Sequence, residues 1–137
     1  MIVVDTGPLI ALFDPKDPAH VRCVDALKTI HDRLYTTLPV LTEAFHILQP
    51  DSVGSDRLRD FIVHGGISIW FFDDPQLLRA FELMEQYSDS SMDLADASLI
   101  VAAEALRTKD VFTIDRRDFR RYRIRRGHRH HAPEIIP

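Results

Sequence analysis

The sequence has few of the residues that cross-link small proteins. Cys23 is the only cysteine among 137 residues, so an intramolecular disulfide and a cysteine-based zinc site are both excluded. Such a chain suits a reducing compartment, and we expect a cytoplasmic protein. The N-terminal apolar run Met1–Phe13 is too short to cross a bilayer and is interrupted by Asp5 and Pro8. It also lacks the basic start of a signal peptide, so we interpret it as a buried strand followed by a turn at Thr6–Pro8, and we expect no membrane contact.

Internal repeats, low-complexity linkers and domain boundaries are also missing from the sequence. The chain is 45% hydrophobic and 28% charged, which is ordinary for a globular protein. A chain of this length can bury roughly 65–70% of the surface that it exposes when unfolded. We therefore expect one domain over residues 1–137.

Basic residues are scarce in most of the chain and concentrated near its end. Residues 1–115 carry 19 acidic side chains against 9 lysines and arginines, whereas residues 116–137 carry eight arginines against Asp118 and Glu134. Such a separation indicates contact with nucleic acid or another acidic partner. The alternative is that the arginines of this Arg- and His-rich segment, about residues 116–131, neutralise the acidic body. Charge alone does not choose between the two.

Short β-branched or aromatic segments alternate with amphipathic ones. The predicted strands are Ile2–Val4, Leu34–Thr36, Ile67–Phe72, Val111–Ile114 and an edge strand at Tyr122–Ile124. The predicted helices are Leu9–Phe13, His20–His31, Pro39–Leu48, Asp56–His64, Pro75–Tyr87 and Asp93–Arg107. This alternation predicts an α/β fold, a three-layer α/β/α sandwich around a mainly parallel sheet. Within it we expect Trp70, Phe71 and Phe72 to be core residues.

Acidic residues stand where such a fold places its ligand site. Ligands of open α/β sheets bind beyond the C-terminal ends of the strands, and Asp5 and Asp115 each follow a predicted strand. Glu43 and Asp96 lie in the first turns of two predicted helices. If those helices begin at the same sheet edge, four carboxylates converge on one cleft.

A cluster of carboxylates requires a cation, because each raises the pKa of its neighbours. Hard oxygen ligands suit Mg²⁺ or Mn²⁺ better than Zn²⁺. A metal held in this way favours hydrolysis of a phosphodiester.

Each acid also has a purely structural explanation. Asp93 is suited to be a helix N-cap with Asp96 three residues on, and Asp5 and Asp115 can each start a turn. Glu43 can be an exposed helix residue, and Asp118 is better suited to pair with arginines than to bind metal. No single acid indicates a metal site by itself, but the set of acids in this order along the chain does.

Four segments resemble the motifs of PIN domains. Val3–Leu12 is similar to the opening strand of that family, and Leu41–Ala44 to its second motif. Met92–Ala103 resembles the third motif, in which an Asp precedes a small, apolar helix, and Val111–Phe119 resembles the fourth. The resemblance covers roughly residues 2–124.

The resemblance implies a VapC-type ribonuclease, commonly the toxin of a toxin–antitoxin pair, that cuts RNA with Mg²⁺ or Mn²⁺. The metal ligands and catalytic residues that it implies are Asp5, Glu43, Asp96 and Asp115. Asp93 is then either an additional ligand or a residue that supports the ligands from outside, while Thr6 and Thr113 orient carboxylates or water by hydrogen bonds and Asp118 is auxiliary. An antitoxin partner and a homodimer are common in the family.

The resemblance does not explain the end of the chain. Next to the fourth motif we expect RNA contacts from Arg116, Arg117, Arg120 and Arg121, since arginine binds phosphates. We expect His128, His130 and His131 to belong to a solvated tail, not a metal site.

Two other functions compete with the nuclease. A haloacid-dehalogenase-type phosphatase needs a second Asp two residues after the first, but position 7 is Gly. A non-catalytic PIN-like module that binds RNA or protein would not need all four acids.

Overall fold

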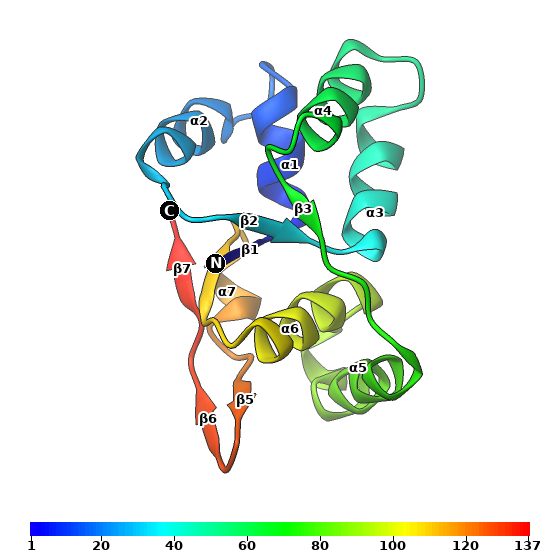
Figure 1. Cartoon of the computed structure of the whole chain (residues 1–137), viewed down its shortest axis with the longest axis vertical. Coiled ribbons are helices and arrows are strands. Elements are labelled where there is room, and N and C mark those ends of the chain that lie inside the picture. The colour runs from blue at the N-terminus through cyan, green and yellow to red at the C-terminus, as the bar shows by residue number, and fades with distance from the viewer.

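The computed structural model describes all residues from Met1 to Pro137 and contains a central five-stranded sheet (Figure 1). Its strands lie in the order β3-β2-β1-β4-β7, and every pairing in it is parallel. The strands are β1 (Ile2–Val4), β2 (Leu34–Thr36), β3 (Ser68–Ile69), β4 (Asp110–Phe112) and β7 (Glu134–Ile136). The predicted α/β class with a parallel sheet is confirmed.

Helices cover both faces of the sheet (Figure 1). On one side lie α1 (Thr6–Phe13), α2 (His20–Thr29), α3 (Leu38–Leu48) and α4 (Val53–Val63). On the other lie α5 (Asp74–Gln86), α6 (Leu94–Leu106) and the short α7 (Arg116–Phe119), with a 3₁₀ turn η1 (Ser88–Ser90) between α5 and α6. No helix is long and apolar enough to cross a membrane.

The most buried elements are β1 and α6. All three residues of β1 are buried, since this strand lies between β2 and β4 and is covered on both faces. Helix α6 is buried over Ala97–Ala103, where alanines let neighbouring elements approach closely. The first strand and the start of α6 are therefore fixed from several sides, and both carry acids of the predicted site.

The end of the chain differs from the prediction. Tyr122 is fully buried and lies outside any strand, so the predicted edge strand Tyr122–Ile124 is wrong. Instead β5 (Ile124–Arg126) pairs antiparallel with β6 (Arg129–His131) in a separate hairpin, and β7 forms the sheet edge beside β4. His130 and His131 thus belong to a strand and not to a tail.

Two further predictions need correction. The expected turn Thr6–Pro8 is the first turn of α1, because Asp5 caps the helix directly. A Cβ at Gly7 would lie 2.6 Å from Cγ1 of Ile114, so this turn requires glycine for its close approach to the end of β4. Strand β3 ends at Ile69, and Phe71 is 66% exposed, so Phe71 is not a core residue.

Candidate active site

Asp5 lies at the centre of the edge formed by the C-terminal ends of the strands. It follows β1 directly and is the N-cap of α1, where its Oδ1 accepts a hydrogen bond of 2.8 Å from the backbone N–H of Thr6. Its Oδ2 accepts a hydrogen bond of 2.8 Å from the hydroxyl of Thr113. Both carboxylate oxygens are therefore fixed, and the residue is only 7% exposed.

Thr113 connects Asp5 with the acid that follows β4. Its hydroxyl oxygen also accepts a hydrogen bond of 3.0 Å from the backbone N–H of Asp115. Asp115 in turn is the N-cap of α7, and its Oδ1 accepts from the backbone N–H of Asp118 at 3.1 Å. The role predicted for Thr113, to orient carboxylates, agrees with these contacts.

The start of α6 contributes two more acids. Asp93 is the N-cap, and its Oδ1 accepts a hydrogen bond of 2.8 Å from the backbone N–H of Asp96. Asp96 lies in the first turn, and its Oδ2 accepts a hydrogen bond of 3.1 Å from the hydroxyl of Tyr122. The capping explanation of Asp93 is therefore confirmed, and its role as an additional ligand stays a prediction.

Glu43 faces these residues from α3. The start of α3 is joined to α6 by a hydrogen bond of 2.6 Å between the hydroxyls of Thr37 and Ser98, both of which are buried. This contact holds α3 beside α6, and Asp93 is close enough to raise the pKa of Glu43. The two predicted helices therefore do begin at the same edge of the sheet.

The electrostatics show that the acids influence one another. The pKa of Asp5 is raised to about 6, chiefly by burial; the hydrogen bonds from Thr113 and Thr6 lower it, and Glu43 and Asp115 make smaller contributions that raise it. Burial also raises the pKa of Asp96 to about 7, with contributions from Asp93 and Asp5. The pKa of Glu43 is raised by burial first and by Asp93 second. Each ionised acid here is unfavourable for its neighbours.

No basic side chain of the protein neutralises this cluster. The five ion pairs of the structure all lie elsewhere, so the acids have no lysine or arginine partner within 4.0 Å. In this structure, no three acidic, histidine or cysteine side chains lie close enough together to hold one metal ion. The fold brings the acids to one edge but does not by itself bring them to ligating distance.

The predicted auxiliary residues Asp118 and Thr6 differ in their contacts. Asp118 makes no ion pair with an arginine; its pKa is raised by partial burial and by Asp115, and Arg121 and Arg117 lower it. The expected pairing of Asp118 with arginines is thus limited to a long-range effect. The hydroxyl of Thr6 is buried beside Asp5 without a hydrogen-bond partner, which leaves a polar atom free for a ligand.

Sequence reasoning missed Tyr122 as a site residue. Its ring packs edge-on against Tyr87 and Phe119, with ring centroids 5.1 and 5.0 Å away, and its hydroxyl reaches Asp96. The one signal in the sequence was an aromatic residue in an otherwise basic run, three residues after Phe119.

An open cavity adjoins the acids. Its volume is about 620 Å³, and it reaches both Glu43 and Asp93. The remaining lining residues are mostly apolar: Leu38, Pro39, Thr42, His46, Phe72, Leu94 and Ala95. A ligand in this cavity would approach the carboxylates from the side of α3.

Comparison with known proteins gives a consistent result. Residues 2–125 match the PIN domain family. The chain is 27% identical over 122 residues to ribonuclease VapC26 of Mycobacterium tuberculosis, covering 86% of this chain and 89% of that protein.

Solved structures share the fold. VapC20 of M. tuberculosis, a toxin that cleaves the sarcin–ricin loop, is similar with a TM-score of 0.78 at 15% identity over 86% of this chain and 92% of the other. FitAcB from Neisseria gonorrhoeae is similar with a TM-score of 0.61 at 18% identity over 87% and 91% of the two chains. Since the family match spans nearly the whole chain, the protein belongs to the PIN domain family.

Proposed function

We propose that this protein is a metal-dependent endoribonuclease of the VapC type that hydrolyses RNA phosphodiester bonds. The observation that carries the proposal is the cluster of four acids at the strand ends, which has no basic partner within the protein. The similarity to ribonuclease VapC26 supports RNA as the substrate.

The residues present fit a divalent metal ion. Asp5, Glu43, Asp96 and Asp115 offer only hard carboxylate oxygens, which favour Mg²⁺ or Mn²⁺. The unpartnered hydroxyl of Thr6 is a further oxygen beside Asp5. When bound, such an ion supplies Lewis acidity for water activation and for neutralising charge on the phosphate.

The chain's own residues would act by holding this acidic edge in place. Thr113 fixes Asp5 and the backbone of Asp115 together, and Tyr122 orients Asp96. Glu43 would complete the set from α3, on the side of the open cavity, where the scissile phosphate would enter. A bound ion would offset the repulsion between the carboxylates and so favour their approach to ligating distance.

Arginines beside the fourth acid would bind the RNA. Arg116, Arg117 and Arg120 are exposed on or next to α7, and none has an acidic partner. Arg116 donates a hydrogen bond to the carbonyl of Pro137, and Arg121 donates one of 3.3 Å to the Ser90 hydroxyl. Arg117 and Arg120 are the freest of the four predicted contacts.

We also propose partners of the kind that similar proteins have. VapBC2 of Rickettsia felis, bound to a promoter DNA fragment, has a TM-score of 0.63 at 14% identity over 88% of this chain and 92% of the other. This likeness supports an antitoxin partner for the chain. The homodimer and the cytoplasmic site of action stay predictions from the sequence.

The test is cleavage of a fluorescent RNA with added MnCl₂. Asp5→Asn keeps the shape and the N-cap but removes the charge, so it should abolish cutting while circular dichroism stays unchanged. Asp60→Asn, an exposed acid on α4, is the matched control and should cut normally. Full activity of Asp5→Asn, or of the wild type in excess EDTA, would refute the proposal. RNA binding that never leads to cutting would favour the non-catalytic module.

A further inference from the structure

The β5–β6 hairpin projects from the body of the protein (Figure 1). Ile124 pairs with His131, Arg125 with His130 and Arg126 with Arg129, so the strands are joined by a two-residue turn at Gly127 and His128. Gly127 has a φ of 62°, as a tight hairpin turn requires. Every residue from Arg125 to His130 is exposed.

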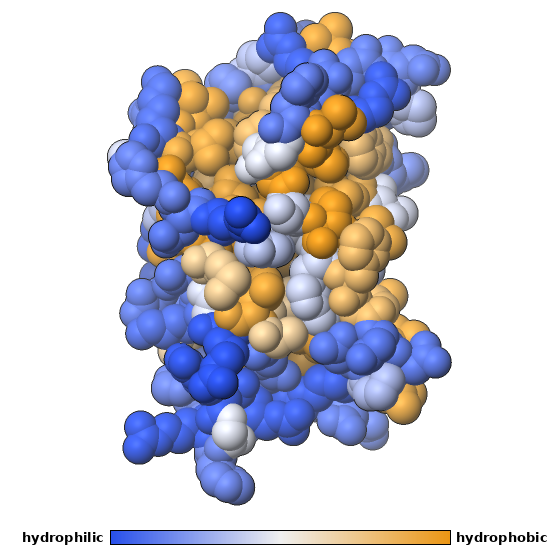
Figure 2. All heavy atoms as spheres, viewed as in Figure 1, coloured by the Kyte–Doolittle hydropathy of each residue, from blue (hydrophilic) through white to orange (hydrophobic).

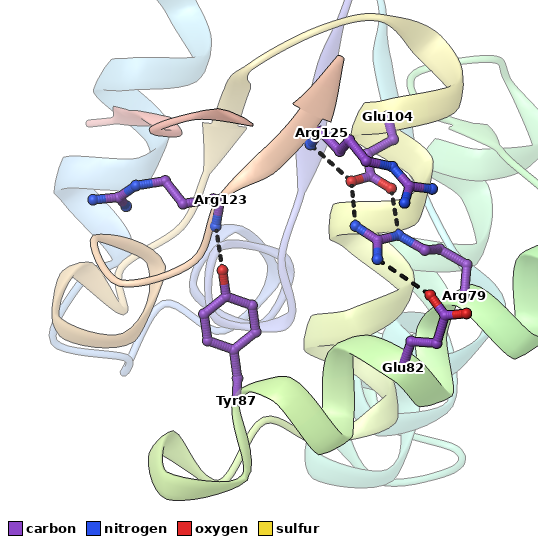
Figure 3. A network of polar contacts seen from close by, with 6 residues as sticks. All are labelled: Arg79, Glu82, Tyr87, Glu104, Arg123 and Arg125. Carbon is purple, nitrogen blue, oxygen red and sulfur yellow. Dashed lines mark hydrogen bonds and ion pairs between the residues drawn. The ribbon is translucent and has the colours of Figure 1, made fainter. Parts of the chain in front are cut away.

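The body holds this hairpin through its backbone (Figure 3). The backbone N–H of Arg123 donates to the Tyr87 hydroxyl at 3.0 Å, and that of Arg125 donates to Glu104 Oε2 at 2.8 Å. Glu104 is itself held by two hydrogen bonds of 3.0 Å from Arg79. Because the anchor uses main-chain groups, it leaves the hairpin guanidinium groups available.

The exposed cations have no acidic partner in this chain. None of the arginines between Arg116 and Arg129 takes part in an ion pair. The guanidinium group of Arg123 donates hydrogen bonds to the carbonyl oxygens of Arg120 and Tyr122. The side chains of Arg125, Arg126 and Arg129 donate no hydrogen bond, although the backbone N–H of Arg125 does. Direct ion pairing with the acidic body therefore does not account for the hairpin arginines. In Figure 2 the lower part of the molecule, where the hairpin lies, is strongly hydrophilic.

A small basic cavity lies between the hairpin and the loop after α6. Its volume is about 120 Å³, roughly the space of four water molecules. The lining contains no acid and consists of Arg107, Thr108, Lys109, Ile124, Arg126 and His131. Lys109 is bound to Glu134 at 2.7 Å, so the unpaired positive charge comes from the two arginines. The cavity has the size and charge for one phosphate group.

We propose that the hairpin and this cavity bind the phosphate backbone of RNA, as a second contact away from the acidic site. The inference rests on the proposed ribonuclease function. Asp96 and Arg107 lie at opposite ends of α6, about 16 Å apart along its axis. A strand cut at the acids would reach the hairpin about five stacked nucleotides away.

The test compares RNA binding by two triple variants. In the hairpin variant, glutamine replaces Arg125, Arg126 and Arg129. In the control variant, glutamine replaces three arginines outside the hairpin that are exposed and make no ion pair: Arg22, Arg33 and Arg57. Both lose three positive charges. Binding of a fluorescein-labelled 20-nucleotide RNA is measured by anisotropy in EDTA, so that no cutting occurs, from 50 to 200 mM NaCl.

At 100 mM NaCl the hairpin variant should bind about tenfold more weakly than the wild type, and its plot of log K against log salt should be less steep by about 2. The control should stay within about twofold of the wild type. Equal affinity and equal slope for both variants would overturn the inference and leave the hairpin free for an acidic protein. Cutting by the wild type in MnCl₂, measured in parallel, tests the proposed function separately.

A measurement on the wild type avoids any doubt about folding. Bound RNA should protect Arg125, Arg126 and Arg129 from modification by phenylglyoxal, as mapped by mass spectrometry. Arg22 and Arg57 should react equally with and without RNA. Unprotected hairpin arginines in a saturated complex would also overturn the inference.

Discussion

Binding of Mn²⁺ should release protons at mildly acidic pH. The acids must be ionised to bind the ion, yet the pKa of Asp5 is raised to about 6 and that of Asp96 to about 7, mainly because Asp5 is buried and Asp96 is partly buried. At pH 6, Asp5 is about half protonated and Asp96 about nine-tenths protonated. Ionisation of both would release about 1.4 protons per ion at pH 6 but only about 0.1 at pH 8. Mn²⁺ affinity should accordingly rise with pH over this range.

Isothermal titration calorimetry measures this number. Mn²⁺ is titrated into the protein at pH 6 and pH 8 in buffers of different ionisation enthalpy, and the slope of the observed enthalpy gives the protons released. Asp60→Asn is the control and should match the wild type. Release below about 0.3 proton at pH 6 would show that Asp5 and Asp96 are already ionised or do not bind the ion.

Three other changes have clear expected results. Tyr122→Phe keeps the packing against Tyr87 and Phe119 but removes the hydrogen bond to Asp96, so Mn²⁺ affinity should fall about tenfold with little change in fold, as calorimetry and circular dichroism would show. Thr113→Val removes the contacts to Asp5 and to the backbone of Asp115 and should lower the free energy of unfolding by about 1–3 kcal/mol in urea titrations. Without metal, the stabilising contribution of protonated Asp5 and Asp96 should be fully present below about pH 4 and be lost as the pH rises through about 6 to 7, because the folded protein holds these protons more tightly than the unfolded chain. Replacing both by Asn should remove this part of the pH dependence from thermal melts, and an unchanged pH dependence would contradict it.

The sheet could be predicted because its central parts are locally encoded. Ile2–Val4 is a β-branched run, and buried parallel strands need such residues. The positions of Asp5 and Asp115 followed from the rule that ligands bind at the C-terminal ends of parallel strands. These inferences needed only the order of elements.

The end of the chain could not be predicted in the same way. Strand β7 is only Glu134–Ile136, and its place at the edge depends on pairing with β4, more than 20 residues earlier. The two strands of the hairpin consist mostly of arginine and histidine, which are not among the residues that favour strands. The contact of Tyr122 with Asp96 depends on tertiary packing and has no local sequence pattern.

Three acids of the candidate site are also the N-caps of helices: Asp5 of α1, Asp93 of α6 and Asp115 of α7. The positive ends of three helix dipoles therefore point at the cluster and offset part of its repulsion. Zinc fingers, in contrast, unfold without their ion. On the proposed mechanism, the capped helices would form before the ion binds, and Mg²⁺ or Mn²⁺ would activate a chain that is already folded.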